Sequence, residues 1–354
     1  MTINFQQILA EKRKLVWNEI QKYLKTPEFP GTLAIPKVYS DLVDFHWGMV
    51  STYPKRLGKY IRPSLVLLTS SAMGVSEEKA FLTAAAMQTS EDWILIHDDW
   101  EDNSLQRRGE VALHRIYGNE LAVNAGDSLH VLMWKMLWDN RKILGDEKAA
   151  EIANEFCQIL ARTTFGQTVE IKWTKENKEG LTDEDVFLIL DGKTSYYTIA
   201  GPMRLGAILG GASQQQLSLI WEFGQNLGRC FQIVDDLLDL TSDFQGLKKQ
   251  TGNDIYEGKR TLMLMHFFRN AAKEDKIKLQ EIMRKDREGK TAKEVEWVIE
   301  KMKEYDSLDY SRRIAQNFAT KALEMFETKL KFLSNQSARD QLKAGIDFIL
   351  HREY

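Results

Sequence analysis

Proline placement is the sequence feature that most constrains how this chain can fold. A proline inside a helix removes one backbone hydrogen bond and clashes with the preceding turn. The 354-residue chain has six prolines, of which five come before residue 64 and the sixth is Pro202. Residues 64–201 and 203–354 contain none. Most of the chain is therefore free to form long helices.

The apolar residues of these proline-free stretches repeat with the period of an α-helix. Apolar side chains recur at steps of three and four from Ile314 to Leu330, which places them on one helix face. The segments TDED (182–185) and TAKE (291–294) have the pattern of capping boxes, which open helices. We find no strand-like alternation bounded by hairpin turns. The sequence predicts a single all-α domain over residues 1–354.

Four stretches lack the helical pattern and are predicted to be loops: 26–37, 103–110, 172–182 and 241–259. The last is long and contains three glycines. A loop of this length inside a compact domain is more often functional than accidental. No stretch is rich enough in Pro, Gly or Ser to separate domains.

Charge and hydropathy narrow the class of protein. The formal net charge of −3 gives no general attraction to nucleic acid. The two cysteines, Cys157 and Cys230, are far apart in the sequence, which fits a reducing compartment. No apolar run reaches the roughly 18 residues that a membrane helix needs, and the first ten residues lack a signal-peptide pattern. We therefore expect a cytoplasmic protein with no transmembrane segment and no nucleic-acid partner.

One acidic pattern occurs twice, each time after an apolar stretch. DDWED (98–102) comes after WILI, and DDLLD (235–239) comes after CFQIV. In each pattern the first and last aspartates are four residues apart and share a helix face. Carboxylates packed so closely repel one another and need a cation. Oxygen ligands on one face suit Mg²⁺, which keeps waters and takes other ligands from a substrate phosphate. One such cluster is as readily a solvated helix end, but two make that interpretation unattractive.

Cationic residues lie beside these acidic patterns, as a diphosphate site requires. The segment GKYIRP carries Lys59 and Arg62, and Arg107 and Arg108 follow shortly after the first acidic pattern. A proline directly after Arg62 biases that residue away from helical backbone. Arginine suits phosphate because its planar guanidinium donates two parallel hydrogen bonds. Further cations are Lys193, Lys248, Lys249 and Lys259.

With these residues in view, the sequence resembles the trans-polyprenyl diphosphate synthases, which include farnesyl and geranylgeranyl diphosphate synthases. Five segments occur in the order and approximate spacing of the family: GKYIRP, LIHDDWEDNSLQRRG, DGKTSYYTIAGPMRLGA, LGRCFQIVDDLLDL and GNDIYEGKRTL. The resemblance implies a bundle of long helices around a central cavity, usually in a homodimer. It also implies head-to-tail condensation of isopentenyl diphosphate with an allylic diphosphate.

The resemblance implies a role for each candidate residue. The ligands of three Mg²⁺ ions would be Asp98, Asp99, Asp102, Asp235, Asp236 and Asp239. The cations that contact the allylic diphosphate would be Arg107, Lys193, Lys249 and Lys259. The isopentenyl site would comprise Lys59, Arg62 and Arg108. Thr194 and Gln232 resemble the polar groups that face the reacting carbons.

The implied chemistry accounts for this set of residues. The allylic carbon–oxygen bond ionises, and Mg²⁺ with fixed cations offsets the charge that develops on the departing diphosphate. The isopentenyl double bond attacks the resulting carbocation. The released diphosphate then accepts the proton, so no side-chain base is assigned. Because water would quench the carbocation, the apolar wall of the site has a function of its own.

One position before the first acidic motif departs from the family. Seven residues before Asp98 the family commonly has His or Gln, which contacts isopentenyl diphosphate, and this chain has Glu91. An anion there is unfavourable unless Lys59 or Arg62 neutralises it. We therefore do not assign that role to Glu91, which is instead a candidate to orient Arg62.

Product length should depend on the residues that precede Asp98 on its helix. Trp93 lies roughly 7.5 Å, and Ser90 roughly 12 Å, from Asp98 along the axis. Trp93 is a candidate floor for the growing chain, with a purely structural core position as the alternative. Ile94 stands where vertebrate farnesyl synthases have an aromatic residue, and the insertion of bacterial farnesyl synthases is missing. Trp93 favours a C15 product, and the other features favour C20.

Two alternatives stay open at this point. A class I terpene cyclase would share the helical fold and the first acidic motif. It would usually carry an Asn/Ser/Glu metal motif in second place and lack an isopentenyl site. A non-catalytic subunit of a heteromeric synthase would be expected to have lost aspartates, and both motifs are complete here. The sequence favours a short-chain synthase with a C15 to C20 product.

Overall fold

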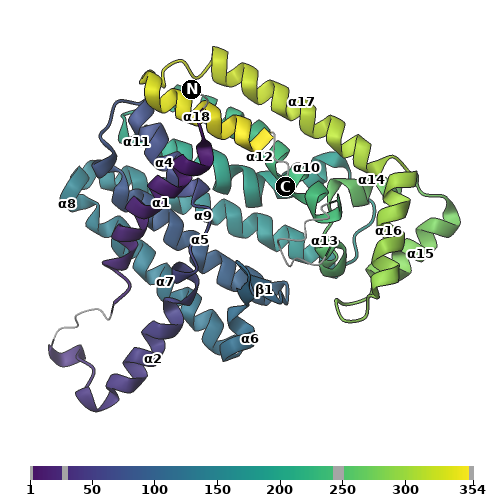
Figure 1. Cartoon of the computed structure of the whole chain (residues 1–354), viewed down its shortest axis with the longest axis horizontal. Coiled ribbons are helices and arrows are strands. Elements are labelled where there is room, and N and C mark those ends of the chain that lie inside the picture. Colours follow the sequence, from purple (N-terminus) through teal and green to yellow (C-terminus); the bar gives the residue numbers. More distant parts are fainter. Residues whose placement is uncertain (1–2, 26–30, 242–250, 351–354) are drawn as a thin grey trace. The chain divides into compact units, whose positions relative to one another are not determined.

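Helices form almost all the secondary structure in this computed structural model, which describes residues 3–25, 31–241 and 251–350 (Figure 1). The all-α prediction is confirmed. The longest helices are α5 (Phe81–Glu101), α7 (Asn119–Asp139), α9 (Asp146–Lys175), α12 (Gln214–Thr241) and α17 (Ser307–Thr328).

Shorter helices connect and cover these five. They are α1 (Phe5–Gln21), α2 (Ser40–Val50), α3 (Thr52–Lys55), α4 (Ile61–Ala72), α6 (Leu113–Tyr117), α8 (Arg141–Leu144), α10 (Asp183–Leu190), α11 (Gly201–Leu209), α13 (Asn253–Glu257), α14 (Leu262–Asn270), α15 (Lys273–Met283), α16 (Ala292–Glu304) and α18 (Gln336–Leu350). Single 3₁₀ turns are formed by Gly31–Leu33, Lys37–Tyr39 and Glu77–Lys79. A π-helix, η4 (Asp191–Ala200), follows α10.

Helix starts that the sequence marked clearly are confirmed. Thr182 with Asp185 at α10, and Thr291 with Glu294 at α16, form complete capping boxes in which side chain and backbone bond reciprocally. The predicted loop at 172–182 begins later than expected, because α9 continues to Lys175.

The helical fold has one local exception, at the predicted loop 103–110. The strands β1 (Gln106–Arg107) and β2 (Glu110–Val111) pair antiparallel. Two-residue strands are too short to leave an alternating pattern in the sequence. Arg108 and Gly109 form the connection with φ of 56° and 79°, the left-handed backbone that a two-residue hairpin turn needs.

One compact unit consists of Met1–Glu155, Pro202–Ala212 and Leu333–Ala344. Its central helix is α5, which packs along α7 and against α1 and α4 (Figure 1). Most of α5 is buried, and its run Ala84–Ala86 is fully so. A helix covered on most sides holds its side chains in fixed positions, so α5 is a rigid support for the acidic motif at its end.

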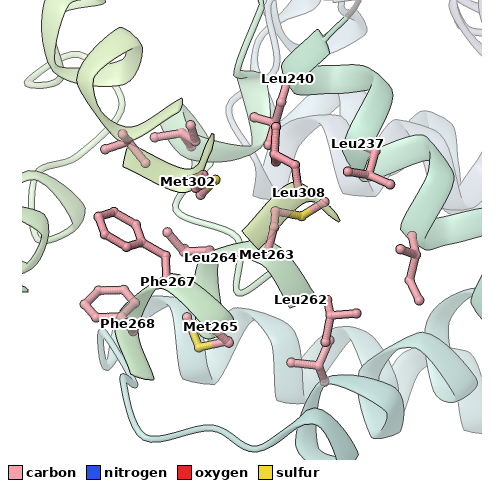
Figure 2. Close-up of a cluster of buried hydrophobic side chains, with 14 of the residues drawn as sticks. Leu237, Leu240, Leu262, Met263, Leu264, Met265, Phe267, Phe268, Met302 and Leu308 are labelled. Carbon is pink, nitrogen blue, oxygen red and sulfur yellow. The ribbon is translucent and has the colours of Figure 1, made fainter. Parts of the chain in front are cut away.

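A second compact unit consists of Phe156–Gly201, Ser213–Phe332 and Gly345–Tyr354. Its central helix is α12, which packs against η4 and α17. The buried side chains of α14 form a core with Leu237 and Leu240 of α12 and with Met302 and Leu308 (Figure 2). This core supports the end of α12 that carries the second acidic motif.

Within the described residues, no helix is suited to span a membrane. The expectations of a single domain, of a cytoplasmic location and of no nucleic-acid partner stay predictions.

Candidate functional site

The first acidic motif occupies the C-terminal end of α5, where Asp102 is the C-cap residue. Asp98 and Asp102 are partly exposed, whereas Asp99 is fully buried. A helix C-terminus carries partial negative charge, so three carboxylates there raise the need for a compensating cation.

Asp99 meets that need with Arg107 of β1. Arg107 Nε donates to both Asp99 carboxylate oxygens at 3.0 Å, and its Nη2 also donates to Oδ1. The Tyr53 hydroxyl donates to Asp99 Oδ2 at 2.6 Å and accepts from the backbone N–H of Leu113 at 3.1 Å. Burial, and then the charge of Asp99, raises the pKa of Tyr53 well above its usual value. The hydroxyl therefore stays protonated and keeps its role as a donor.

Arg107 also links two aspartates of the motif. Its Nη2 atom lies 3.5 Å from Asp98 Oδ2. The predicted contact of Arg107 with the allylic diphosphate would therefore start from a guanidinium that Asp99 has already oriented.

The second acidic motif lies near the end of α12, where Asp235 is exposed, Asp236 is buried and Asp239 is half-buried. Asp236 Oδ1 accepts a hydrogen bond from Gln232 Nε2 at 2.8 Å. Gln232 Oε1 in turn accepts from Thr194 Oγ1 at 2.9 Å. Burial, and then the charge of Asp254, raises the pKa of Asp236 well above its usual value. This chain of polar groups brings together three of the residues that the sequence singled out.

The π-helix η4 positions Lys193 and Thr194. A π-helix has wider turns than an α-helix and is frequently found at functional sites. Lys193 Nζ donates to Glu170 Oε2 of α9 at 2.6 Å. The two backbones approach closely, because a Cβ added to Gly192 would lie 2.9 Å from Gly166 Cα. The absence of both side chains is what allows this contact.

Lys259 follows α13 and is held by two acidic side chains of that helix. Its Nζ atom lies 2.8 Å from Glu257 Oε2 and 3.3 Å from Asp254 Oδ1. The backbone N–H of Asp254 donates to Asp239 Oδ2 at 3.0 Å. The described end of the predicted loop 241–259 is thus joined to the second acidic motif. Lys248 and Lys249 lie outside the described residues.

Lys59 and Arg62 lie at the start of α4, whose N-cap is Tyr60. The prediction that Pro63 keeps Arg62 out of a helix is wrong, since Arg62 lies in the first turn of α4. The prediction used the clash between a proline ring and the preceding residue, which disfavours helical backbone there without excluding it. Pro63 itself is tolerated because the first backbone N–H groups of a helix have no intrahelical partner, so no hydrogen bond is lost.

Glu91 lies between two guanidinium groups. Its Oε2 atom is 3.1 Å from Arg62 Nη1, and its Oε1 atom is 3.7 Å from Arg108 Nη2. The predicted pairing of Glu91 with Arg62 is confirmed. The structure thus brings two of the predicted isopentenyl contacts, Arg62 and Arg108, to the same acidic side chain.

Trp93, the candidate floor for a growing chain, is only 9% exposed. Its ring stacks on His130 of α7, with centroids 4.0 Å apart and planes 11° apart. Trp134 Nε1 donates to His130 Nε2 at 2.8 Å, and burial lowers the pKa of His130, which fits a neutral ring that accepts this bond. Ser90 is fully buried and Ile94 partly so. α5 and α7 together therefore build this region.

Four polar residues that bond the predicted site residues were missed by sequence reasoning. Tyr53 carries no motif that would have marked it, and Glu170 lies between the family-like segments. Asp254 and Glu257 stand inside the quoted segment GNDIYEGKRTL. That segment was the available signal for both.

The carboxylates of both motifs are the candidate ligands for Mg²⁺. Among the residues that the structure describes, no three His, Cys, Asp or Glu side chains are placed to hold a metal ion by themselves. Each motif instead offers a pair of more exposed aspartates four residues apart on a helix. Such a pair, accessible to solvent, fits Mg²⁺, which usually keeps several waters and binds substrate phosphates.

Comparison with known proteins places the chain among prenyl synthases. The polyprenyl synthetase family matches residues 47–302. The chain is 33% identical to the short chain isoprenyl diphosphate synthase of Methanothermobacter thermautotrophicus, over 84% of this chain and 87% of that protein. It is 31% identical to the geranylgeranyl diphosphate synthase of Sulfolobus acidocaldarius, over 75% and 79% respectively. The crystal structure of geranylgeranyl pyrophosphate synthetase from Pyrococcus horikoshii is similar, with a TM-score of 0.83 and 30% identity over 99% of each chain.

Proposed function

Since this chain belongs to the polyprenyl synthetase family, whose members are prenyltransferases, we propose that it condenses isopentenyl diphosphate with allylic diphosphates to a short product, C20. The observation that carries the proposal is that both acidic motifs are complete and that each is bonded to a residue assigned to the diphosphate or the reacting carbons. Arg107 bonds Asp99, and Gln232 bonds Asp236. The C20 length is supported by relatives named geranylgeranyl diphosphate synthase.

Mg²⁺ is the proposed cofactor, and when bound it supplies Lewis-acid stabilisation of the departing diphosphate. Asp98 and Asp102 of the first motif, with Asp235 and Asp239 of the second, are the more exposed carboxylates and would hold the metal. The predicted ligands Asp99 and Asp236 differ from these four in being buried. We expect that pair to support the ligands. The number of ions stays a prediction of three.

Three of the four cations assigned to the allylic diphosphate lie in the described residues, and each of these three is held by an acidic side chain. Arg107 is held by Asp99, Lys193 by Glu170 and Lys259 by Glu257. Charges fixed in this way need no reorganisation when the carbon–oxygen bond ionises, which is how preorganised groups lower an activation barrier. Lys249 stays a prediction.

Thr194 and Gln232 would face the carbocation. Their mutual hydrogen bond of 2.9 Å fixes both dipoles, and the bond from Gln232 to Asp236 ties them to the second motif. An oriented oxygen dipole stabilises positive charge without reacting with it, which free water would do.

The proposal is tested with purified protein, Mg²⁺, labelled isopentenyl diphosphate and, separately, the C5, C10 and C15 allylic primers. Dephosphorylated products are separated by chromatography. A discrete C20 alcohol supports the proposal. Hydrocarbon release from a longer diphosphate, with no extension of any primer, would establish a terpene cyclase instead. No turnover at all would favour a non-catalytic subunit.

Product length is expected to increase in the Trp93→Ala variant. Removal of the indole that stacks on His130 opens space along α5, so the chain can grow by at least one further isoprene unit. Product chromatography measures the change. Trp297→Ala is the control, because Trp297 is a partly buried tryptophan that packs on the core of the other unit. Unchanged length in Trp93→Ala would leave Trp93 with a structural role only.

We propose that the protein is a homodimer that associates through α2 and α7. These two helices contact each other, and apolar side chains on or next to them are unusually exposed: Val38 77%, Leu42 60% and Val131 67%. Grouped exposed apolar side chains indicate an interaction surface.

Sedimentation equilibrium should give twice the monomer mass, and Val131→Glu should shift the protein toward monomer, because a buried unpaired charge opposes association. Ile277→Glu on α15 is the matched control, since Ile277 is also exposed but lies in the other unit. A monomeric wild-type protein, or a dimer that Val131→Glu leaves intact, would contradict this interface.

A further inference from the structure

Arg108 is held in place from several sides by groups that have no assigned role in the proposed reaction. Its Nη1 atom lies 2.8 Å from Asp92 Oδ1 and donates to the carbonyl oxygen of Tyr53 at 2.9 Å. On another side, a Cβ added to Gly58 would lie 2.8 Å from Arg108 Nη2 and 3.1 Å from its Cζ and Nε. The guanidinium therefore lies directly against the Gly58 backbone, and only glycine leaves room for it.

Asp92 is fully buried in the middle of α5. Its other hydrogen bond is a long one, 3.4 Å from Gln88 Nε2, and its Oδ2 atom has no hydrogen-bond partner among the described residues. Burial, opposed by the charge of Arg108, raises the pKa of Asp92 to about 6. A buried carboxylate opposes folding unless it is paired, so the pairing with Arg108 is what makes Asp92 tolerable at this position.

The hairpin β1–β2 places two adjacent arginines against one face of α5. Arg107 pairs with Asp99, and Arg108 pairs with Asp92. Asp92 and Asp99 are seven residues apart, which puts them on the same helix face about 10 Å from each other. The positive φ of Arg108, 56°, belongs to the turn that sends the two neighbouring side chains to different carboxylates.

Net charge gives this group of residues little attraction for a diphosphate. Lys59, Arg62 and Arg108 carry three positive charges, and Glu91 and Asp92 offset two of them as long as both acids are ionised, which leaves a net charge of +1. Much of the affinity must then come from the direction of the N–H donors, because charge-assisted hydrogen bonds to phosphate depend on geometry. The orientation of each guanidinium thus matters more here than in a site with a larger excess of positive charge.

We propose that Asp92 is a positioning residue that orients the guanidinium of Arg108 for binding of isopentenyl diphosphate. The inference rests on the proposed function, in which Arg108 contacts that substrate. Asp92 does not touch the substrate itself, and Gly58 provides the space that lets Arg108 reach it.

Asp92→Asn keeps the shape of the side chain and removes its charge. We expect its KM for isopentenyl diphosphate to rise about tenfold, the loss typical of a weakened charge-assisted hydrogen bond. Its kcat and its KM for the allylic diphosphate should stay within about twofold of the wild type, which is within the scatter of neutral substitutions. Gly58→Ala, which displaces the guanidinium from the opposite side, should give the same selective rise.

A double variant tests whether Asp92 acts through Arg108. If it does, Asp92→Asn combined with Arg108→Ala should have the same KM for isopentenyl diphosphate as Arg108→Ala alone, because coupled residues are not additive. Asp139→Asn is the matched control, since Asp139 is a buried acid of α7 that pairs with Lys135. That variant should leave the KM unchanged.

Each other outcome has a distinct meaning. A KM that Asp92→Asn leaves unchanged in an active enzyme would overturn this inference and leave the proposed function standing. Equal losses for both substrates, or additive effects in the double variant, would show that Asp92 is only structural. A wild-type protein that does not consume isopentenyl diphosphate would overturn the proposed function, and the inference with it.

Discussion

Asp235→Asn is expected to lower kcat for chain extension about a thousandfold, as removal of one preorganised electrostatic group can do, and to leave the thermal unfolding temperature unchanged. Asp235 is an exposed residue of α12, so its replacement disturbs no core. The amide has the size of the carboxylate but no charge to hold Mg²⁺. kcat is measured with both substrates saturating, across a titration of Mg²⁺.

The control for this variant is Glu222→Gln on the same helix. Glu222 is also exposed and lies 13 residues earlier, about 20 Å along the axis. It should behave like the wild type. If Asp235→Asn keeps activity within about tenfold of wild type at every Mg²⁺ concentration, which is less than the loss of one such group, the second motif is not a metal site. That result would favour a mechanism that uses the first motif alone, as in a cyclase.

The acidic motifs could be predicted because their signal is local. Asp98 and Asp102, like Asp235 and Asp239, share a face through the helical period alone, and the capping boxes span only four residues. Residues that share a helix face, or that cap a helix, can be identified from their spacing in the sequence without knowledge of the fold. The same locality explains why the helices themselves were predictable from apolar periodicity.

The partners of the cations could not be predicted in the same way. Arg108 reaches Asp92 from a hairpin turn, Lys193 reaches Glu170 of another helix, and the Tyr53 hydroxyl reaches Asp99 across 46 residues of sequence. Such pairs depend on how helices pack, and no short-range pattern records them. The proline rule at Arg62 failed for a different reason: the clash of Pro63 with the preceding residue is a bias and not an exclusion, and a proline in the first turn removes no helical hydrogen bond.

The π-helical turns of η4 also escaped prediction. They bring the backbone of η4 into close contact with α12. A Cβ added to Gly228 of α12 would lie 2.4 Å from Ser195 Cα and 2.7 Å from Ser195 Cβ. Gly228→Ala therefore forces the two helix backbones apart. We expect the free energy of unfolding to fall by about 3 kcal/mol, the upper range for overpacking of a core. A thermal or urea denaturation series measures this loss.

The same variant should lower kcat about a hundredfold, because a displacement of about 1 Å at a catalytic group has an effect of that size. Thr194 is next to Ser195, and its hydrogen bond to Gln232 of α12 crosses the widened contact. Gly180→Ala is the matched control, since nothing lies within 4 Å of a Cβ there. Adding Ser195→Gly to Gly228→Ala should recover only part of both losses, because the clash with Ser195 Cα remains. Wild-type stability and kcat in Gly228→Ala would mean that the close contact of η4 with α12 does not set the position of Thr194.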